Sequence, residues 1–114
     1  MNPGQYNFTC PKGTTFSKSV TYKVNKFAVN LTGYSARMQV RETLASTSTL
    51  VSLSSPSNGM TVNSAGVITM TISAATTAGF ANGTYVYDLE IESAGGVVTR
   101  LLEGKFKVTG EVTR

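Results

Sequence analysis

The feature that most constrains this chain of 114 residues is an alternation of apolar and polar side chains with a period of two. Over residues 85–92, four apolar residues alternate with a valine and three carboxylates. Over residues 36–41, small or apolar residues alternate with Arg37, Gln39 and Arg41. Because successive side chains of a β-strand point to opposite faces of its sheet, this period predicts half-buried strands.

Further alternations recur along the whole chain, at residues 6–10, 14–24, 50–53, 60–62, 67–73 and 97–109. Turn signals separate them about every ten residues, among them Asn58-Gly59, Asn82-Gly83 and Gly95-Gly96. Lys18 interrupts the apolar face of 14–24, which indicates a bulge or an edge strand. No helix of crossover length separates the strands, so a parallel α/β fold is excluded.

Residues 73–80 are the one stretch compatible with a helix, with Ser73 as the N-cap and Gly79 as the stop. Many immunoglobulin-like domains cross between sheets at such a point. Tyr85 or Tyr87 then forms a tyrosine corner, whose hydroxyl bonds back to the connection, or is an ordinary half-buried tyrosine. We therefore expect an all-β fold: a single immunoglobulin-like antiparallel β-sandwich of about seven or eight strands, forming one domain over residues 1–114.

The residues available for catalysis are few. The chain has no His and no Trp, one Cys (Cys10) and one Asp (Asp88), and it lacks a phosphate loop, nucleophile elbow or zinc spacing. Asp88, Glu90 and Glu92 share one strand face and could hold calcium, but a solvated outer face explains them better. We predict that the protein is not an enzyme and has no catalytic residues, cofactor or metal.

Charge is distributed unevenly, although the net charge is only +4. Residues 1–41 carry six basic side chains and no acid, whereas no charged residue occurs over 43–87. The sequence does not interleave closely spaced Lys and Arg residues with aromatic residues, and this argues against nucleic acid as a partner. The basic half is interpreted as a scattered solvated surface or, alternatively, as a surface complementary to neighbouring copies or an acidic partner.

The sequence also bears on location. A single cysteine excludes an internal disulfide, and residues 1–10 lack the basic start and apolar segment of a signal peptide. No stretch approaches the roughly 20 apolar residues of a membrane span. We expect synthesis and retention in a cytosol, with no membrane partner.

Several motifs resemble small virion proteins of tailed phages. The first motifs are a strand Tyr-Asn-Phe-Thr, a run Gly-Thr-Thr-Phe-Ser, and Asn-Leu-Thr-Gly-Tyr leading into the strand Arg-Met-Gln-Val-Arg. Later in the chain come Gly-Thr-Tyr-Val-Tyr-Asp-Leu-Glu-Ile and Arg-Leu-Leu-Glu-Gly. They occupy residues 6–9, 13–17, 30–34, 37–41, 83–91 and 100–104, so the resemblance covers nearly the whole chain. Among named families, the chain resembles the N-terminal immunoglobulin-like domain of the phage baseplate upper protein.

The resemblance implies a non-enzymatic structural protein of a tailed-phage virion, made in the cytoplasm of the bacterial host, that contacts other phage structural proteins and copies of itself. Because the sequence ends at Arg114, just past the expected sandwich, we expect it to lack the domains by which a fused baseplate protein holds its receptor-binding partner. A free-standing domain could equally decorate a capsid or form a tail or neck ring.

The first choice for an exposed contact face is the row Arg37, Gln39 and Arg41. The alternative function is a carbohydrate- or receptor-binding β-sandwich module. Its sugar platform would be Tyr22, Tyr34 or Phe27, since aromatic rings commonly stack on sugars.

Overall fold

A computed structural model describes residues 4–55 and 58–110. In this part of the chain eleven strands form three sheets, and one short helix follows the ninth strand. The elements are β1 (Gly4–Gln5), β2 (Phe8–Pro11), β3 (Phe16–Thr21), β4 (Lys23–Val24), β5 (Phe27–Ala28), β6 (Ser35–Arg41), β7 (Val51–Ser54), β8 (Met60–Val62), β9 (Val67–Ile72), α1 (Ala74–Thr77), β10 (Gly83–Glu92) and β11 (Val98–Thr109).

The larger sheet has the strand order β1-β11-β10-β6-β7, and β2 pairs with β11 farther along the same edge. Its centre is β10, which pairs antiparallel with β11 on one side and with β6 on the other. In contrast, β1 and β2 run parallel to β11, with Gly4 opposite Leu102 and Phe8 opposite Phe106. The prediction of an antiparallel fold therefore fails at the N-terminal strands, which lie along the last strand.

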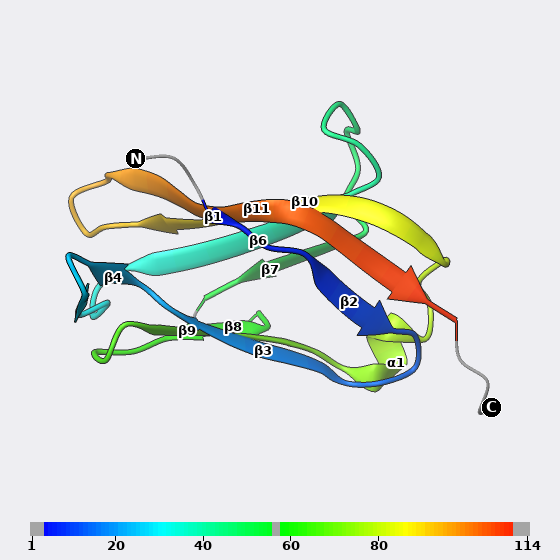
Figure 1. Ribbon diagram of the computed structural model, residues 1–114, viewed down its shortest axis with the longest axis horizontal. Coiled ribbons are helices and arrows are strands. Elements are labelled where there is room, and N and C mark those ends of the chain that lie inside the picture. The colour runs from blue at the N-terminus through cyan, green and yellow to red at the C-terminus, as the bar shows by residue number, and fades with distance from the viewer. Residues whose placement is uncertain (1–3, 56–57, 111–114) are drawn as a thin grey trace.

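The three-stranded sheet, which we call the smaller sheet, has the order β3-β9-β8, and both of its pairings are antiparallel. Figure 1 shows it as a second layer beneath the larger sheet. The hairpin predicted over 60–73 is confirmed as β8 and β9. Because β3 lies at the sheet edge, the edge position that Lys18 indicated is confirmed as well.

The apolar rows of both sheets meet in one core. Leu89 of β10 and Ile68 of β9 are both fully buried in the same cluster. The rings of Phe16 in the smaller sheet and Phe106 in the larger one lie 5.3 Å apart between centroids. The four apolar residues that alternate along β10 are all buried, as their spacing predicts: Tyr85, Tyr87, Leu89 and Ile91.

The connection between β9 and β10 contains the predicted helical turn. Ser73 caps α1 by accepting a hydrogen bond from the Thr76 backbone N–H. The Thr77 hydroxyl is buried and donates to the Thr14 carbonyl, which ties the helix to the segment before β3. The Tyr85 hydroxyl donates to the Ala81 carbonyl at 2.8 Å, so the tyrosine-corner interpretation is confirmed for Tyr85.

Some expectations need correction. Eleven strands replace the expected seven or eight because three segments of two residues, β1, β4 and β5, count separately. The alternations over residues 6–10 and 14–24 predict Tyr6 and Val24 on the core side, but these side chains are 55% and 40% exposed. A bulge in β11 leaves Leu101 between the pairs Leu89–Leu102 and Glu90–Arg100, so the faces exchange there. The alternation over residues 97–109 predicts Thr99 on the outer face, but because of the bulge Thr99 lies opposite the buried Ile91.

Candidate functional site

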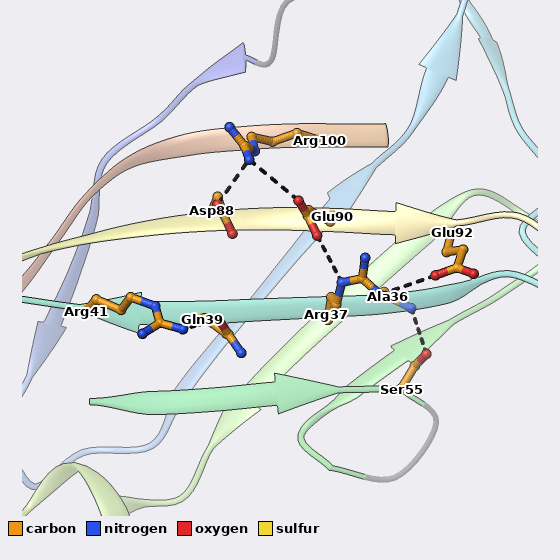
Figure 2. A network of polar contacts seen from close by, with 9 residues as sticks. All are labelled: Ala36, Arg37, Gln39, Arg41, Ser55, Asp88, Glu90, Glu92 and Arg100. Carbon is orange, nitrogen blue, oxygen red and sulfur yellow. Dashed lines mark hydrogen bonds and ion pairs between the residues drawn. The ribbon is translucent and has the colours of Figure 1, made fainter. Parts of the chain in front are cut away.

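The outer face of the larger sheet, turned away from the core, carries most of the charged side chains of β6, β10 and β11. Register places Arg37 opposite Glu90, and Gln39 opposite Asp88. On the other side of β10, Glu90 lies opposite Arg100. Figure 2 shows the resulting chain of side chains running across three neighbouring strands. We call this set, Arg37, Asp88, Glu90, Glu92 and Arg100, the charge ladder.

Glu90 is the centre of the charge ladder because it pairs with both arginines. Arg37 Nε lies 2.9 Å from Glu90 Oε1, and Arg37 Nη1 lies 3.3 Å from Glu92 Oε1. Arg100 lies 3.6 Å from both Asp88 Oδ2 and Glu90 Oε2. The hydrogen bond to Glu90 is the main reason that the pKa of Arg37 is raised. Each carboxylate of the ladder therefore has a cation of the same chain beside it.

Arg41, at the end of the same row, holds the loop between β6 and β7. Its Nη1 donates to the Ser46 carbonyl at 2.8 Å, and its Nη2 donates to the Gln39 side-chain oxygen at 2.9 Å. The loop projects from the larger sheet at the top of Figure 1, and Leu44 is 91% exposed within it. Arg41 thus holds this loop in place through hydrogen bonds to uncharged oxygen atoms.

A hollow of about 570 Å³ opens on this outer face beside the charge ladder. Most of the residues that line it are polar or charged, and Val86 and Leu44 are aliphatic. Its lining comprises Gln5, Asn7, Gln39, Arg41, Leu44, Val86, Tyr87, Asp88, Arg100, Glu103, Gly104 and Lys105. The hollow is large enough to receive a side chain of a partner, or a small polar ligand.

The N-terminal strands form one wall of the hollow and are fastened to β11. Gln5 donates to the Glu103 carboxylate at 2.8 Å, and the Lys105 backbone N–H donates to Asn7 Oδ1 at 3.0 Å. A Cβ atom at Gly104 would collide with the Tyr6 carbonyl oxygen. Glycine is therefore required at 104 for the close approach of these two strands.

Burial changes the acidity of two groups at this wall. The Tyr87 hydroxyl donates to the Tyr6 carbonyl at 2.7 Å, and burial is the main reason that its pKa is raised far above the usual range. Burial also raises the pKa of the Asp88 carboxyl, and the positive charge of Arg100 opposes that shift. Both groups hold a proton more tightly than they would in water.

Arg37, Gln39 and Arg41 do share the outer face, as the sequence predicts, but all three side chains form hydrogen bonds within the chain. Sequence reasoning missed Arg100, which completes the ladder. The Gly95-Gly96 turn is the signal that could have found it, because that hairpin brings β11 alongside β10.

Asp88, Glu90 and Glu92 share a face, as predicted, and Arg37 and Arg100 lie against them. Over residues 4–55 and 58–110, no three His, Cys, Asp or Glu side chains are grouped so as to hold a metal ion. Cys10 lies in the core, where burial raises the pKa of its thiol. Within the same residues, no helix has the length and apolar character to cross a membrane.

Among the aromatic residues considered for a sugar platform, Phe27 is 77% exposed, while Tyr22 and Tyr34 are partly buried against the core. Phe27 lies on the β4–β5 hairpin and does not line the hollow. No protein-family model matches the chain, and no curated protein matches its sequence. The evidence on function therefore consists of the geometry of the outer face and the residue patterns of the sequence.

Proposed function

We propose that the chain is a single immunoglobulin-like β-sandwich that serves as a non-enzymatic structural protein of a tailed-phage particle. In immunoglobulin domains, strands C, F and G form one sheet, while B, E and D belong to the other. The orders β6-β10-β11 and β3-β9-β8 follow the same succession along the chain. The tyrosine corner of Tyr85 at the start of β10 gives independent support to this fold.

The observation that carries the functional proposal is the fixed polar surface on the outer face of the larger sheet. The carboxylates of its charge ladder are already paired with arginines of the same chain, so a partner that covers the face leaves none of these carboxylates without a counter-charge. Side chains held in place by such contacts also lose little freedom on binding. Together with the resemblance to small virion proteins, which covers nearly the whole chain, this surface supports the proposal that the chain contacts other phage structural proteins or further copies of itself.

The stoichiometry of the chain in purified phage particles tests this function. Quantitative mass spectrometry against the major capsid protein gives the copy number. A ratio near one, or a simple fraction of it, indicates a capsid decoration protein. A few to a few dozen copies per particle indicate a tail, neck or baseplate component. Absence from the particle would contradict the proposal.

The row Arg37, Gln39 and Arg41 needs a test that separates contact from internal pairing. Arg37→Glu reverses the charge but also breaks the pair with Glu90. The double variant Arg37→Glu with Glu90→Arg restores an internal pair while keeping the reversed charge at 37. If the row meets a partner, both variants should lose particle incorporation, whereas Lys26→Glu on the β4–β5 hairpin should not. Full incorporation of the double variant would remove Arg37 from the contact.

A carbohydrate- or receptor-binding module is the second candidate, and the 77% exposure of Phe27 favours it. An exposed ring can stack on a sugar or fill a pocket of a receptor. Binding of the wild type on a glycan array, lost in Phe27→Ala, would support this function. A wild-type protein without any bound glycan would argue against the carbohydrate form of it.

A further inference from the structure

The smaller sheet ends in an open edge at β3. This strand pairs with β9 on one side only, because the N-terminal strands that precede it pair with β11 of the larger sheet. In constant-type immunoglobulin domains a strand A covers this position. Among the residues that the structure describes, the backbone of residues 16–21 forms hydrogen bonds only with β9. Every second residue of β3 therefore directs an unpaired N–H and C=O outward.

A lysine stands in the middle of this edge, on the side that faces the core. Phe16, Lys18 and Val20 lie opposite the buried residues Ile72, Met70 and Ile68 of β9, respectively. Lys18 is nevertheless exposed, because no strand lies beyond β3. None of the described carboxylates is within ion-pair distance of Lys18 or of Lys23, which follows the strand.

A cleft with several apolar side chains in its wall adjoins the C-terminal half of this edge. It has a volume of about 270 Å³ and opens between β3 and β4 on one side and β1 and β11 on the other. Its apolar lining is half-buried and consists of Val20, Tyr22, Leu101 and Leu102. The bulge in β11 contributes Leu101 to this lining. The cleft can receive an aliphatic side chain that would otherwise be exposed to water.

We propose that β3 accepts an added strand from a partner protein, through an extended segment that carries a carboxylate beside Lys18 and an aliphatic residue two positions away. The backbone of the segment would pair with the open edge of β3, which is the usual mode of strand addition. Residues two apart on a strand share a face, so a carboxylate beside Lys18 places the aliphatic side chain above the cleft beside Val20. The inference concerns an edge of the smaller sheet, whereas the charge ladder lies on the larger sheet. It does not depend on the function proposed above.

The partner segment is acidic, and it is not the β3 edge of a second copy. Two β3 strands paired about Lys18 would bring their ammonium groups together, and like charges on opposing strands are destabilising. An inward-pointing lysine protects an edge strand from unselective pairing in the same way. A carboxylate on the incoming strand turns this repulsion into attraction, so Lys18 selects the partner.

The probe is a blocked, fluorescently labelled peptide, Thr-Val-Thr-Glu-Thr-Val-Thr. Its symmetry places a valine two residues from the glutamate whichever way the strand runs. Fluorescence anisotropy with the full chain should give a Kd of about 1 mM or tighter. Lys18→Glu should weaken binding by about tenfold, because an attraction becomes a repulsion. The matched control Lys107→Glu, an exposed lysine on the outer face of β11, should leave Kd within about twofold.

Two further peptides complete the test. A peptide with lysine in place of glutamate should prefer Lys18→Glu over the wild type. A peptide N-methylated at every residue keeps its charge but has no backbone donors, so it should not bind. The proposal is overturned if the first peptide does not bind at about 5 mM, if Lys18→Glu and Lys107→Glu weaken binding equally, or if the N-methylated peptide binds as well as its parent. Circular dichroism of each variant verifies that it is folded.

Discussion

The two sheets are alike on their inner faces and differ on their outer ones. Both present alternating apolar residues to one core, with Leu89 and Ile68 fully buried. The outer face of the larger sheet holds the charge ladder, whereas the smaller sheet exposes hydroxyl groups, such as the Ser19–Thr69 pair at 3.1 Å. No charged side chain occurs on β8 or β9.

This difference shows that the inner pattern determines the fold, while the outer pattern determines how each surface can meet a partner. Surface ion pairs contribute about 0–1 kcal/mol each, well below the contribution of a buried aliphatic side chain. The charge ladder therefore adds little to folding. Its main physical effect is to fix the orientation of the side chains around the hollow.

The largest expected effect tests whether the core is truly shared. Leu89→Ala in the larger sheet and Ile68→Ala in the smaller one should each lower the free energy of unfolding by about 2–5 kcal/mol, because each leaves a cavity among fully buried neighbours. Urea denaturation measures both. If one substitution has an effect below about 1 kcal/mol, the two sheets do not depend on the core equally.

A smaller effect is expected at the connection between the two sheets. Tyr85→Phe removes the hydroxyl that donates to the Ala81 carbonyl, and it should lower the free energy of unfolding by about 1–3 kcal/mol. Tyr6→Phe is the control, because the Tyr6 side chain is 55% exposed. Equal effects of the two substitutions in thermal unfolding would show that the corner bond does not stabilise the connection.

The contrast between the outer faces predicts a different response to salt. Arg37→Ala should lower the free energy of unfolding by about 0–1 kcal/mol, and the difference should shrink as salt is raised. Ser19→Ala should change it by less than about 0.5 kcal/mol, independently of salt. Denaturation at low and high ionic strength distinguishes them. A salt-independent effect at Arg37 would mean that its packing matters more than its charge.

The smallest effect concerns the pH dependence of stability at Asp88. Its pKa is raised in the folded state, mainly by burial, so the folded protein binds this proton more tightly than the unfolded chain does. The stability that this proton contributes is present below the usual aspartate range and is lost as pH rises through the raised pKa. Asp88→Asn lacks this loss. Relative to the variant, the wild type should therefore lose stability between about pH 3 and 7; a relative gain would contradict the shift.

The strand alternation could be read from the sequence because it is a local property. The pattern over 85–92 and 36–41 gives the correct inner faces of β10 and β6. The Ser73 cap and the Tyr85 corner also follow from local signals. In contrast, the bulge at Leu101 has no local signal, because it depends on how β11 matches β10. The β4–β5 hairpin was missed for a related reason, since its turn uses Asn25 and Lys26 at positive φ where glycine is usual.

The candidate site was only half predictable for the same physical reason. Alternation places Arg37 and Glu90 on the outer faces of their own strands, but only the register between β6 and β10 brings them to 2.9 Å. Arg41 illustrates the limit further, because its partners are loop carbonyls whose positions no pattern encodes. The prediction of an exposed row thus identified the correct face but not its internal bonds.

The parallel pairing of β2 with β11 has a mechanical consequence. Phe8 pairs with Phe106 and Pro11 pairs with Thr109, so the two strands run through the pair in the same direction. Tension applied to the N-terminal end of β2 and the C-terminal end of β11 pulls the two parallel strands in opposite directions along their length. All their hydrogen bonds then resist together, whereas an antiparallel pair joined by a turn opens one bond at a time. We expect single-molecule pulling through these strands to meet a higher rupture force than pulling apart the β10–β11 hairpin. In the particle role that we propose, such a pair would transmit strain without unravelling.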